Sequence, residues 1–363
     1  MRELTFAEAT REAMEEEMAR DPTVFLWGED IAKQGGVFGQ FRGLAERFGL
    51  ERVRDTPISE ATLVGMTLGA ALAGARPVFD LHFADFLGIV MDEVANQIAK
   101  IRYMSGGQLK VPLVIRAPDG AIRSAGPHHS QSLEAWVTHV PGLAVVAPAT
   151  PADAKGLLKA AIRSDDPVLF FEHKALYPRK GPVPDGEHVV PLGKARVARE
   201  GRDVTLISYS MTLWKCLEAA DRLSAEGVAC EVVDLRTLVP LDWDLVLDSV
   251  SRTRRAVVAH EAWRFGGFGA EVAAALTERL WDRLLAPVGR VGARGVPIPF
   301  SPPLERYVIP QTEDIVAKVR EVLGERARGA SAAARSGDGE RQAPGGPQGS
   351  RGTGGEGRAP SGD

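Results

Sequence analysis

Several features are scarce in this chain, and each scarcity argues against a class of protein. Among 363 residues only Cys216 and Cys230 are cysteines, without a CxxC spacing, which argues against a disulfide framework or cysteine-ligated metal and favours a reducing cytoplasm. No apolar run is long and uncharged enough to span a bilayer, and the N-terminus has no apolar signal segment. A formal net charge of -4 gives no general attraction to nucleic acid or anionic membrane. P-loops and fixed-period repeats are absent too.

Helical and strand patterns alternate along most of the chain. Apolar strand patterns such as TVFLWGED, VPLVIRAP and PVLFFEH are separated by helical ones, and Thr5 and Glu8 form a capping box before the first helix. This alternation predicts an α/β fold with two doubly wound parallel sheets. A Pro- and Gly-rich stretch over 177–192 predicts a linker, which gives domains at 1–185 and 186–324. Residues 325–363 have almost no apolar side chains and are predicted to be a disordered tail.

Polar and aromatic residues follow two of the predicted strands. WGED ends in acids that include Glu29, and LHFADF carries Phe83 and Phe86 three residues apart. Ligands of doubly wound folds bind at the carboxyl ends of strands, so both segments are candidates for a site. As an isolated pair, the two phenylalanines favour core packing.

Two further segments allow a structural and a functional interpretation. In RDTPISEATLVGMTLGAALAGARP, Glu60 opens a helix rich in Gly and Ala, where Ser59 is a good N-cap and an acid suits the helix dipole. In GPHHSQS, His128 and His129 lie in a loop between strands. They fit a polar surface loop or an imidazole acting as acid and base.

Taken together and in order, these fragments resemble one family. GED, DTPISE, RYMSGG, HHSQS, PGLAVVAPATPADAKGLLKAAIRSDDPV and EVVDLRTLVPLD resemble the beta subunit of the thiamine-diphosphate-dependent dehydrogenase component of 2-oxo acid dehydrogenase complexes, over about 4–323. The resemblance implies a transketolase-like pyrimidine-binding domain. It also implies a transketolase C-terminal-like domain, used for dimerisation and for docking the lipoyl acyltransferase core.

The resemblance also implies roles for residues of this chain. Glu60 matches the glutamate that hydrogen-bonds N1′ of the aminopyrimidine, and small residues after it would let its helix pack closely. Phe86 matches the aromatic ring that stacks on the pyrimidine. His129 matches the histidine that stabilises the developing intermediate or protonates the lipoyl group. Glu29 matches an acid near the cofactor or in a channel between paired sites.

The chain has little with which to hold the cofactor's diphosphate. Mg²⁺ prefers oxygen ligands, usually supplied by a GDG followed by paired asparagines. Asn96 is the sole asparagine, and the GDG at 337–339 lies in the predicted tail without an asparagine after it. We therefore expect an alpha subunit to hold Mg²⁺ and diphosphate, in a heterotetramer of two alpha and two beta chains.

A potassium site is a further, tentative expectation from the resemblance. Some relatives hold K⁺ around the positions of Leu113, Ala161, Ile162 and Asp166. Ser164 stands where an aspartate is common in those relatives, which is a departure from the pattern.

The resemblance predicts oxidative decarboxylation of a 2-oxo acid, pyruvate or a branched-chain acid, with reductive acylation of a lipoyl group. FFEHKALY and PFSPPLE also resemble acetoin dehydrogenase beta subunits. Two further functions fit the same fold: a transketolase-like enzyme without a lipoyl acceptor, and a non-catalytic assembly subunit. Glu60, Phe86 and His129 together argue against a non-catalytic subunit.

Overall fold

A computed structural model describes residues 1–324. The predicted disordered tail, 325–363, and its GDG lie outside the described residues. Residues Met1–Leu323 form one unit that contains three sheets of seven, five and two strands. No helix in this part of the chain is long and apolar enough to cross a membrane.

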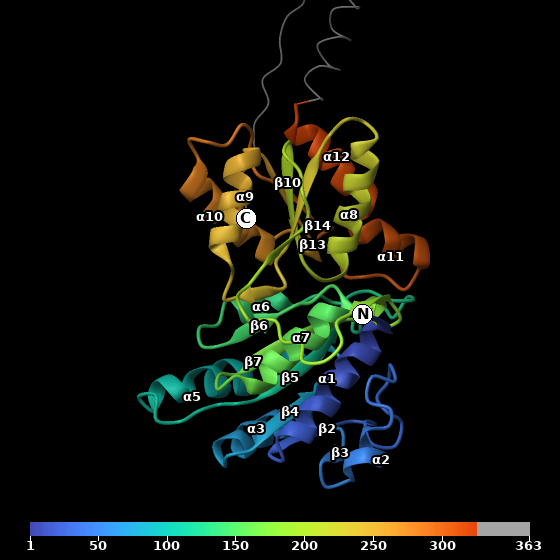
Figure 1. Ribbon diagram of the computed structural model, residues 1–363, viewed down its shortest axis with the longest axis vertical. Helices are drawn as coiled ribbons and strands as arrows, with labels where there is room; N and C mark the ends of the chain where they lie inside the picture. Colours follow the sequence, from blue (N-terminus) through green and yellow to red (C-terminus); the bar gives the residue numbers. More distant parts are fainter. Residues whose placement is uncertain (325–363) are drawn as a thin grey trace, which may run out of the picture. The chain divides into compact units, whose positions relative to one another are not determined.

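The seven-stranded sheet carries most of the N-terminal half, in the strand order β12-β6-β7-β5-β4-β2-β3 (Figure 1). Its neighbours pair in parallel except at one edge, where β12 runs antiparallel to β6. The strands are β2 (Val24–Gly28), β3 (Val53–Asp55), β4 (Arg76–Asp80), β5 (Val114–Asp119), β6 (Ala144–Val146), β7 (Val168–His173) and β12 (Thr237–Val239).

Helices cover both faces of this sheet. Neighbouring residues of a strand point to opposite sides, so each strand contributes side chains to both interfaces. Val78 packs with α1 (Phe6–Arg20) and α7 (Pro151–Arg163), which also pack on each other. Phe79 instead packs with helices of the opposite face. Those helices are α3 (Glu60–Leu72), α4 (Leu87–Asp92), the π-helical η2 (Glu93–Ile98) and α5 (Ala99–Met104).

The five-stranded sheet has the order β14-β13-β10-β11-β9 and is also covered on both sides. Its strands pair in parallel apart from β9, which runs antiparallel to β11. The strands are β9 (Arg196–Arg199), β10 (Val204–Ser208), β11 (Cys230–Asp234), β13 (Ala256–Trp263) and β14 (Gly289–Ala293). Its helices are α8 (Ser210–Ser224), α9 (Trp243–Thr253), α10 (Phe268–Leu280) and α12 (Thr312–Val322).

The remaining elements are short. A two-stranded antiparallel sheet joins β1 to β8 and so ties the chain start to the end of the first half. These strands and the short helices are β1 (Arg2–Thr5), β8 (Lys180–Val183), α2 (Leu44–Phe48), η1 (Ala84–Phe86), α6 (Glu134–Thr138), η3 (Lys174–Leu176) and α11 (Pro302–Val308).

The predicted class is confirmed, with differences in detail. The Thr5–Glu8 capping box is present, whereas the Ser59 side chain makes no cap hydrogen bond, so helix capping does not account for the Ser59–Glu60 pair. Close packing on the small residues of α3 is not uniform, because a Cβ at Gly69 would meet nothing within 4 Å. The boundary at 185/186 stays a prediction, and β12 from beyond it completes the first sheet.

Candidate active site

The candidate site begins where β2 and β4 end side by side. Glu29 directly follows β2, and His82 and Phe83 follow β4 by two and three residues. Burial raises the pKa of the half-buried Glu29 carboxyl, and the negative charges of Glu60 and Asp30 raise it further. Glu60 is therefore close enough to oppose the ionisation of Glu29.

Glu60 is the first residue of α3 and is half-buried. Within residues 1–324 its carboxylate accepts no hydrogen bond, although it acts electrostatically on Glu29 and His82. A carboxylate at a helix N-terminus is stabilised by the helix dipole. Its lone pairs are thus left without a protein partner among residues 1–324.

Aromatic rings join the strand end to the histidine loop. The ring centroid of His129 lies 4.6 Å from that of Phe83 and 5.9 Å from that of Phe86, both edge-on. Phe83 also meets Phe86 edge-on at 5.7 Å. Three of the four predicted residues nearest the chemistry, Glu60, Phe86 and His129, thus belong to one neighbourhood, with His82 and Phe83 between them.

Asp85 fixes the loop that carries His129. Its Oδ1 accepts the backbone N–H of Gln131 at 3.1 Å and the side-chain amide of Gln131 at 2.9 Å. The His129 N–H donates to the carbonyl of Gly126 at 3.3 Å. His129 is half-buried whereas His128 is exposed, in keeping with the choice of His129.

A buried ionic cluster lies behind the aromatic rings. The Lys174 ammonium lies 5.4 Å from the Phe83 ring centroid and has no hydrogen-bond partner among the described residues. Burial lowers the pKa of Lys174, against the charges of Asp119, Asp85 and Glu261. Burial, reinforced by the charge of Glu134, raises the pKa of Asp119 well above its ordinary value. Sequence reasoning missed this cluster, because its members come together only through tertiary structure.

Another buried acid, Asp80, ends β4 directly before the site. Burial raises its pKa to about 7, despite the opposing charge of Arg116. Arg116 itself pairs with the buried Glu172 on the neighbouring strand, at 2.5 Å. A Cβ at Gly28 would come 2.9 Å from the Asp80 Cβ, so glycine is required where β2 passes this carboxyl.

The residues of the tentative potassium site are brought near one another, but arginines already occupy part of it. The Arg76 guanidinium donates to the carbonyls of Ile162 at 3.0 Å and Ser164 at 2.8 Å. Asp166 pairs with Arg102. The carbonyls of Leu113 and Ala161 accept backbone N–H groups from Val168 and Ser164. These residues therefore do not fit a bare cation well, since guanidinium groups supply positive charge there.

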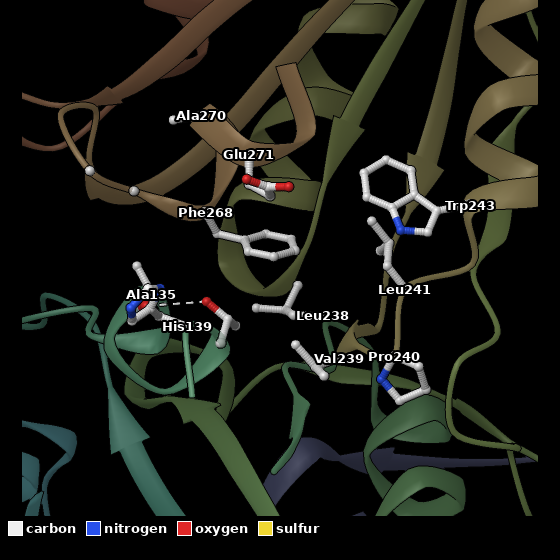
Figure 2. Close-up of a pocket in the computed structure, with 13 residues that line it drawn as sticks. Ala135, His139, Leu238, Val239, Pro240, Leu241, Trp243, Phe268, Ala270 and Glu271 are labelled. Carbon is white, nitrogen blue, oxygen red and sulfur yellow. Dashed lines mark hydrogen bonds between the residues drawn. The ribbon is translucent and has the colours of Figure 1, made fainter. Parts of the chain in front are cut away.

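A well-formed pocket lies away from these residues. It measures about 790 Å³ between α6, the β12 segment and the start of α10. Figure 2 shows Phe268 and Leu238 pointing into it, with Glu271 above them. None of Glu29, Glu60, Phe86 and His129 lines this pocket. We assign the chemistry to the strand ends, where ionisable and aromatic groups converge, because volume alone identifies no reaction.

The strand-end residues fit the pyrimidine half of thiamine diphosphate. They offer an unpartnered carboxylate and two aromatic rings, together with buried polar atoms left without partners, among them His82 Nδ1, Asp85 Oδ2 and Ser130 Oγ. A ring bearing nitrogen atoms needs both kinds of contact. For the diphosphate, residues 1–324 hold no group of three or more His, Cys, Asp and Glu side chains placed to bind a metal ion.

Comparison with known proteins gives the same class. The family model "Transketolase, pyrimidine binding domain" matches residues 2–180, and "Transketolase, C-terminal domain" matches 193–315. A solved split-gene transketolase, an inactive beta4 tetramer, aligns with a TM-score of 0.71 at 27% identity, covering 88% of this chain and 98% of that one. The fold is that of the transketolase class.

Curated relatives narrow this class. The chain is 42% identical to the pyruvate dehydrogenase E1 component subunit beta of Rickettsia felis and 43% identical to the 2-oxoisovalerate dehydrogenase subunit beta of Bacillus subtilis, each over 88% of this chain and 98% of the relative. It is 44% identical to the acetoin:2,6-dichlorophenolindophenol oxidoreductase subunit beta of Cupriavidus necator, over 89% and 98%. The chain belongs to this family of dehydrogenase E1 beta subunits.

Proposed function

We propose that this chain is the beta half of a thiamine-diphosphate-dependent dehydrogenase, which decarboxylates a 2-oxo acid and transfers the acyl group to a lipoyl arm. The observation that carries the proposal is the convergence of Glu29, Glu60, Phe86 and His129 at the carboxyl ends of β2 and β4. Family membership supports it independently. The names of all three relatives describe dehydrogenases or oxidoreductases, and none of the three names describes a transketolase.

When bound, thiamine diphosphate supplies a nucleophilic carbon for the keto group and holds the electron pair left by the departing carbon dioxide. Glu60 would hold a proton against the pyrimidine nitrogen N1′, which would favour the form of the ring's amino group that can accept a proton. The Phe86 ring would cover a face of the pyrimidine and exclude water. His129 would stabilise the developing charge or give a proton to the lipoyl sulfur.

Glu29 has a different task because its pKa is raised by burial and by Glu60. A raised pKa favours the protonated carboxyl, which can donate a hydrogen bond where an ionised one cannot. We assign Glu29 to the edge of the cofactor pocket or to a channel between paired sites.

We further propose that an alpha subunit completes the site in a heterotetramer of two alpha and two beta chains, with an acyltransferase core as the next partner. The support is chemical: a single asparagine leaves the chain without the usual amide ligands for Mg²⁺. Each of the strand-end residues Glu29, Glu60, Phe86 and His129 is only half-buried, which fits half of a shared site. A cytoplasmic location fits the two free, buried cysteines.

Co-expression with an alpha subunit tests this proposal. The assembled protein should bind thiamine diphosphate with Mg²⁺ and reduce a dye or a lipoylated domain with one of pyruvate, branched-chain 2-oxo acids or acetoin. The chain alone should show no decarboxylation. Robust turnover by the chain alone would contradict the shared site, and transfer to an aldose acceptor in place of lipoyl would favour a transketolase-like enzyme.

The substrate stays open between three classes. Identities of 42%, 43% and 44% to pyruvate, 2-oxoisovalerate and acetoin enzymes differ too little to choose. We therefore propose a 2-oxo acid as the substrate and test acetoin as a separate arm of the same assay.

A further inference from the structure

The loop that carries His129 spans residues 120–131, between β5 and α6. Its base is closed by the Gly120 N–H, which donates to the Gln131 carbonyl at 3.1 Å. Within the loop, the His129 N–H donates to the Gly126 carbonyl at 3.3 Å. The place of the imidazole therefore depends on the backbone that leads to Gly126.

That backbone contains a turn in a strained conformation. The Ala125 N–H donates to the Ile122 carbonyl at 3.1 Å, and the two central residues, Arg123 and Ser124, have φ values of +47° and +59°. Positive φ at both central positions is the pattern of a type I′ turn, which normally uses Gly, Asn or Asp. A turn of this kind built from other residues persists where the surroundings impose it, often at functional sites.

Glu305, in α11, supplies a hydrogen bond that holds this turn. Its side chain is half-buried, and Oε2 accepts the Ser124 N–H at 3.0 Å. The Glu305 backbone is itself fixed, since its N–H donates to Ser301 at 2.8 Å and its carbonyl accepts the Ile309 N–H at 3.1 Å. Within residues 1–324 the carboxylate accepts no other hydrogen bond, so the turn is the group that it holds.

Apolar contacts from the same part of the chain lie on either side of this hydrogen bond. Before the turn, the buried Ala121 packs in a cluster with Ile298. After the turn, Gly126 lies so close to Phe300 that a Cβ at this glycine would come 2.5 Å from a ring carbon. The segment that leads to the catalytic loop's histidine is therefore seated on residues 298–308.

We propose that Glu305 is a positioning residue for this reaction, whose carboxylate holds the Ile122–Ala125 turn and thereby sets the place of His129 at the site. The inference rests on the proposed function and deepens it, because the second half of the chain then contributes to the step assigned to His129. Glu60 and Phe86 lie on other elements, α3 and η1, so binding of the pyrimidine should not depend on Glu305.

Substitutions in the assembled heterotetramer test the proposal. Glu305→Ala removes the acceptor, whereas Glu305→Gln keeps a side-chain oxygen that can accept the Ser124 N–H. Arg306→Ala is the matched control, because Arg306 is exposed on the same helix. Phe300→Ala, which removes the ring beside Gly126, is the second variant in case Glu305→Ala folds poorly.

Glu305→Ala should lower kcat for transfer to a lipoylated domain about tenfold, because a displaced catalytic group costs rate. KM for the 2-oxo acid and the affinity for thiamine diphosphate with Mg²⁺ should change less than about twofold. Glu305→Gln should recover most of the rate, and Arg306→Ala should match the wild type. An equal loss in Glu305→Gln and Glu305→Ala, or no loss in Glu305→Ala and Phe300→Ala, overturns the proposal.

A double-mutant cycle determines whether Glu305 acts through His129. Glu305→Ala should cost about tenfold in the wild type but less than about twofold when His129→Ala is already present, because the group that it positions is then gone. Phe300→Ala should show the same dependence on His129. A general structural effect would cost the same in both backgrounds, and that result overturns the proposal.

Hydrogen exchange separates this inference from the proposed function. In the full chain, Glu305→Ala should speed the exchange of amides in residues 120–131, and Arg306→Ala should leave it unchanged. Unchanged protection in Glu305→Ala overturns the proposal. If the wild-type heterotetramer neither binds thiamine diphosphate nor turns over any of the substrates, the proposed function fails, while the exchange experiment still tests the contact.

Discussion

At the scale of single residues, the site combines carboxyls in different environments. Glu60 stands unpartnered at a helix start, while Glu29 and Asp80 have raised pKa values because they are buried near other acids. Environments that push the pKa values of neighbouring acids apart are typical of catalytic sites. Two residue predictions follow from this contrast.

Glu60→Gln removes the proton that is shared with the cofactor ring but keeps the shape of the side chain. In the assembled protein we expect a loss of several kcal/mol of transition-state stabilisation, on the order of a thousandfold in kcat. Steady-state kinetics with the preferred substrate measures this. The exposed Glu46→Gln, in α2, is the matched control. Near-normal turnover in Glu60→Gln would leave that carboxyl without a catalytic role.

Asp80→Asn should change how stability depends on pH. The folded pKa of about 7 lies above the ordinary 3.8, so wild-type Asp80 favours the folded state at low pH and that contribution is lost as pH rises from about 4 to 7. The asparagine side chain does not titrate, so the variant does not lose this contribution. Its free energy of unfolding, relative to that of the wild type, should therefore rise by a few kcal/mol at most between pH 5 and pH 8. Urea unfolding of the full chain at both pH values measures it, with the exposed Asp282→Asn as control. An unchanged difference between the two pH values would show that Asp80 is ionised throughout.

Local sequence identified the residues whose chemistry is visible in a short motif, and missed those defined by contacts. Glu29 and Phe86 drew attention because they follow apolar strands, and Glu60 because it opens an apolar helix, but their roles were predicted from the family resemblance. No pattern predicts the hydrogen bond from Ser124 to Glu305, since it joins residues that are 181 positions apart in the sequence.

At the scale of elements, single side chains hold two connections in place, the loop that carries His129 and the turn between α7 and β7. The loop with His129 is tied to η1 through Asp85 and Gln131. The turn between α7 and β7 is tied to β4 through Arg76. Each connection consists of the hydrogen bonds of one side chain, so a single substitution can remove it.

Asp85→Ala removes both hydrogen bonds to Gln131 and should loosen the segment that holds His129. Misplacement of a catalytic group by about 1 Å can cost on the order of a hundredfold. We expect kcat to fall by about tenfold or more and hydrogen exchange of the loop to increase. Asp85→Asn retains an acceptor oxygen and should lose less. If both variants lose activity equally while the loop stays protected, Asp85 acts through its charge.

The hydrogen bonds of Arg76 predict that potassium raises the Tm of the protein little. Arg76 already donates hydrogen bonds to the carbonyls of Ile162 and Ser164, and a second guanidinium group pairs with the carboxylate of Asp166. The wild-type Tm should therefore be equal in KCl and NaCl of the same concentration. Arg76→Met exposes the carbonyls and should lower Tm. A Tm that rises in KCl alone for the wild type would restore the potassium site.

At the scale of the whole molecule, a buried, hydrogen-bonded carboxylate joins the two halves of residues 1–323. Glu261, on β13, accepts from the Ala121 N–H at 2.7 Å and lies 2.9 Å from the His173 imidazole. The same imidazole explains Gly120, where a Cβ would come 2.1 Å from His173 Nε2. The seven-stranded and five-stranded sheets are therefore connected through the Glu261 carboxylate.

Glu261→Gln should destabilise the chain by about 3 kcal/mol near neutral pH, because it leaves buried groups partly unpaired. Burial would raise the Glu261 pKa, but His173, Lys215 and the Ala121 N–H bring it to about 2. Its contribution is therefore present above the ordinary value near 4.5 and is lost as pH falls toward 2. Unfolding curves of the variant and of the exposed control Glu278→Gln should diverge at pH 7 and approach each other below pH 4.5. Equal curves at pH 7 would show the pair to be energetically neutral.

The position of the antiparallel strand β12 determines where the chain can be divided into stable fragments. Cutting at the predicted linker would strip β6 of its neighbour and bare a row of backbone donors and acceptors, an invitation to self-association. A fragment meant to carry the pyrimidine-binding half should therefore bring residues 237–239 along, by circular permutation or as an added peptide.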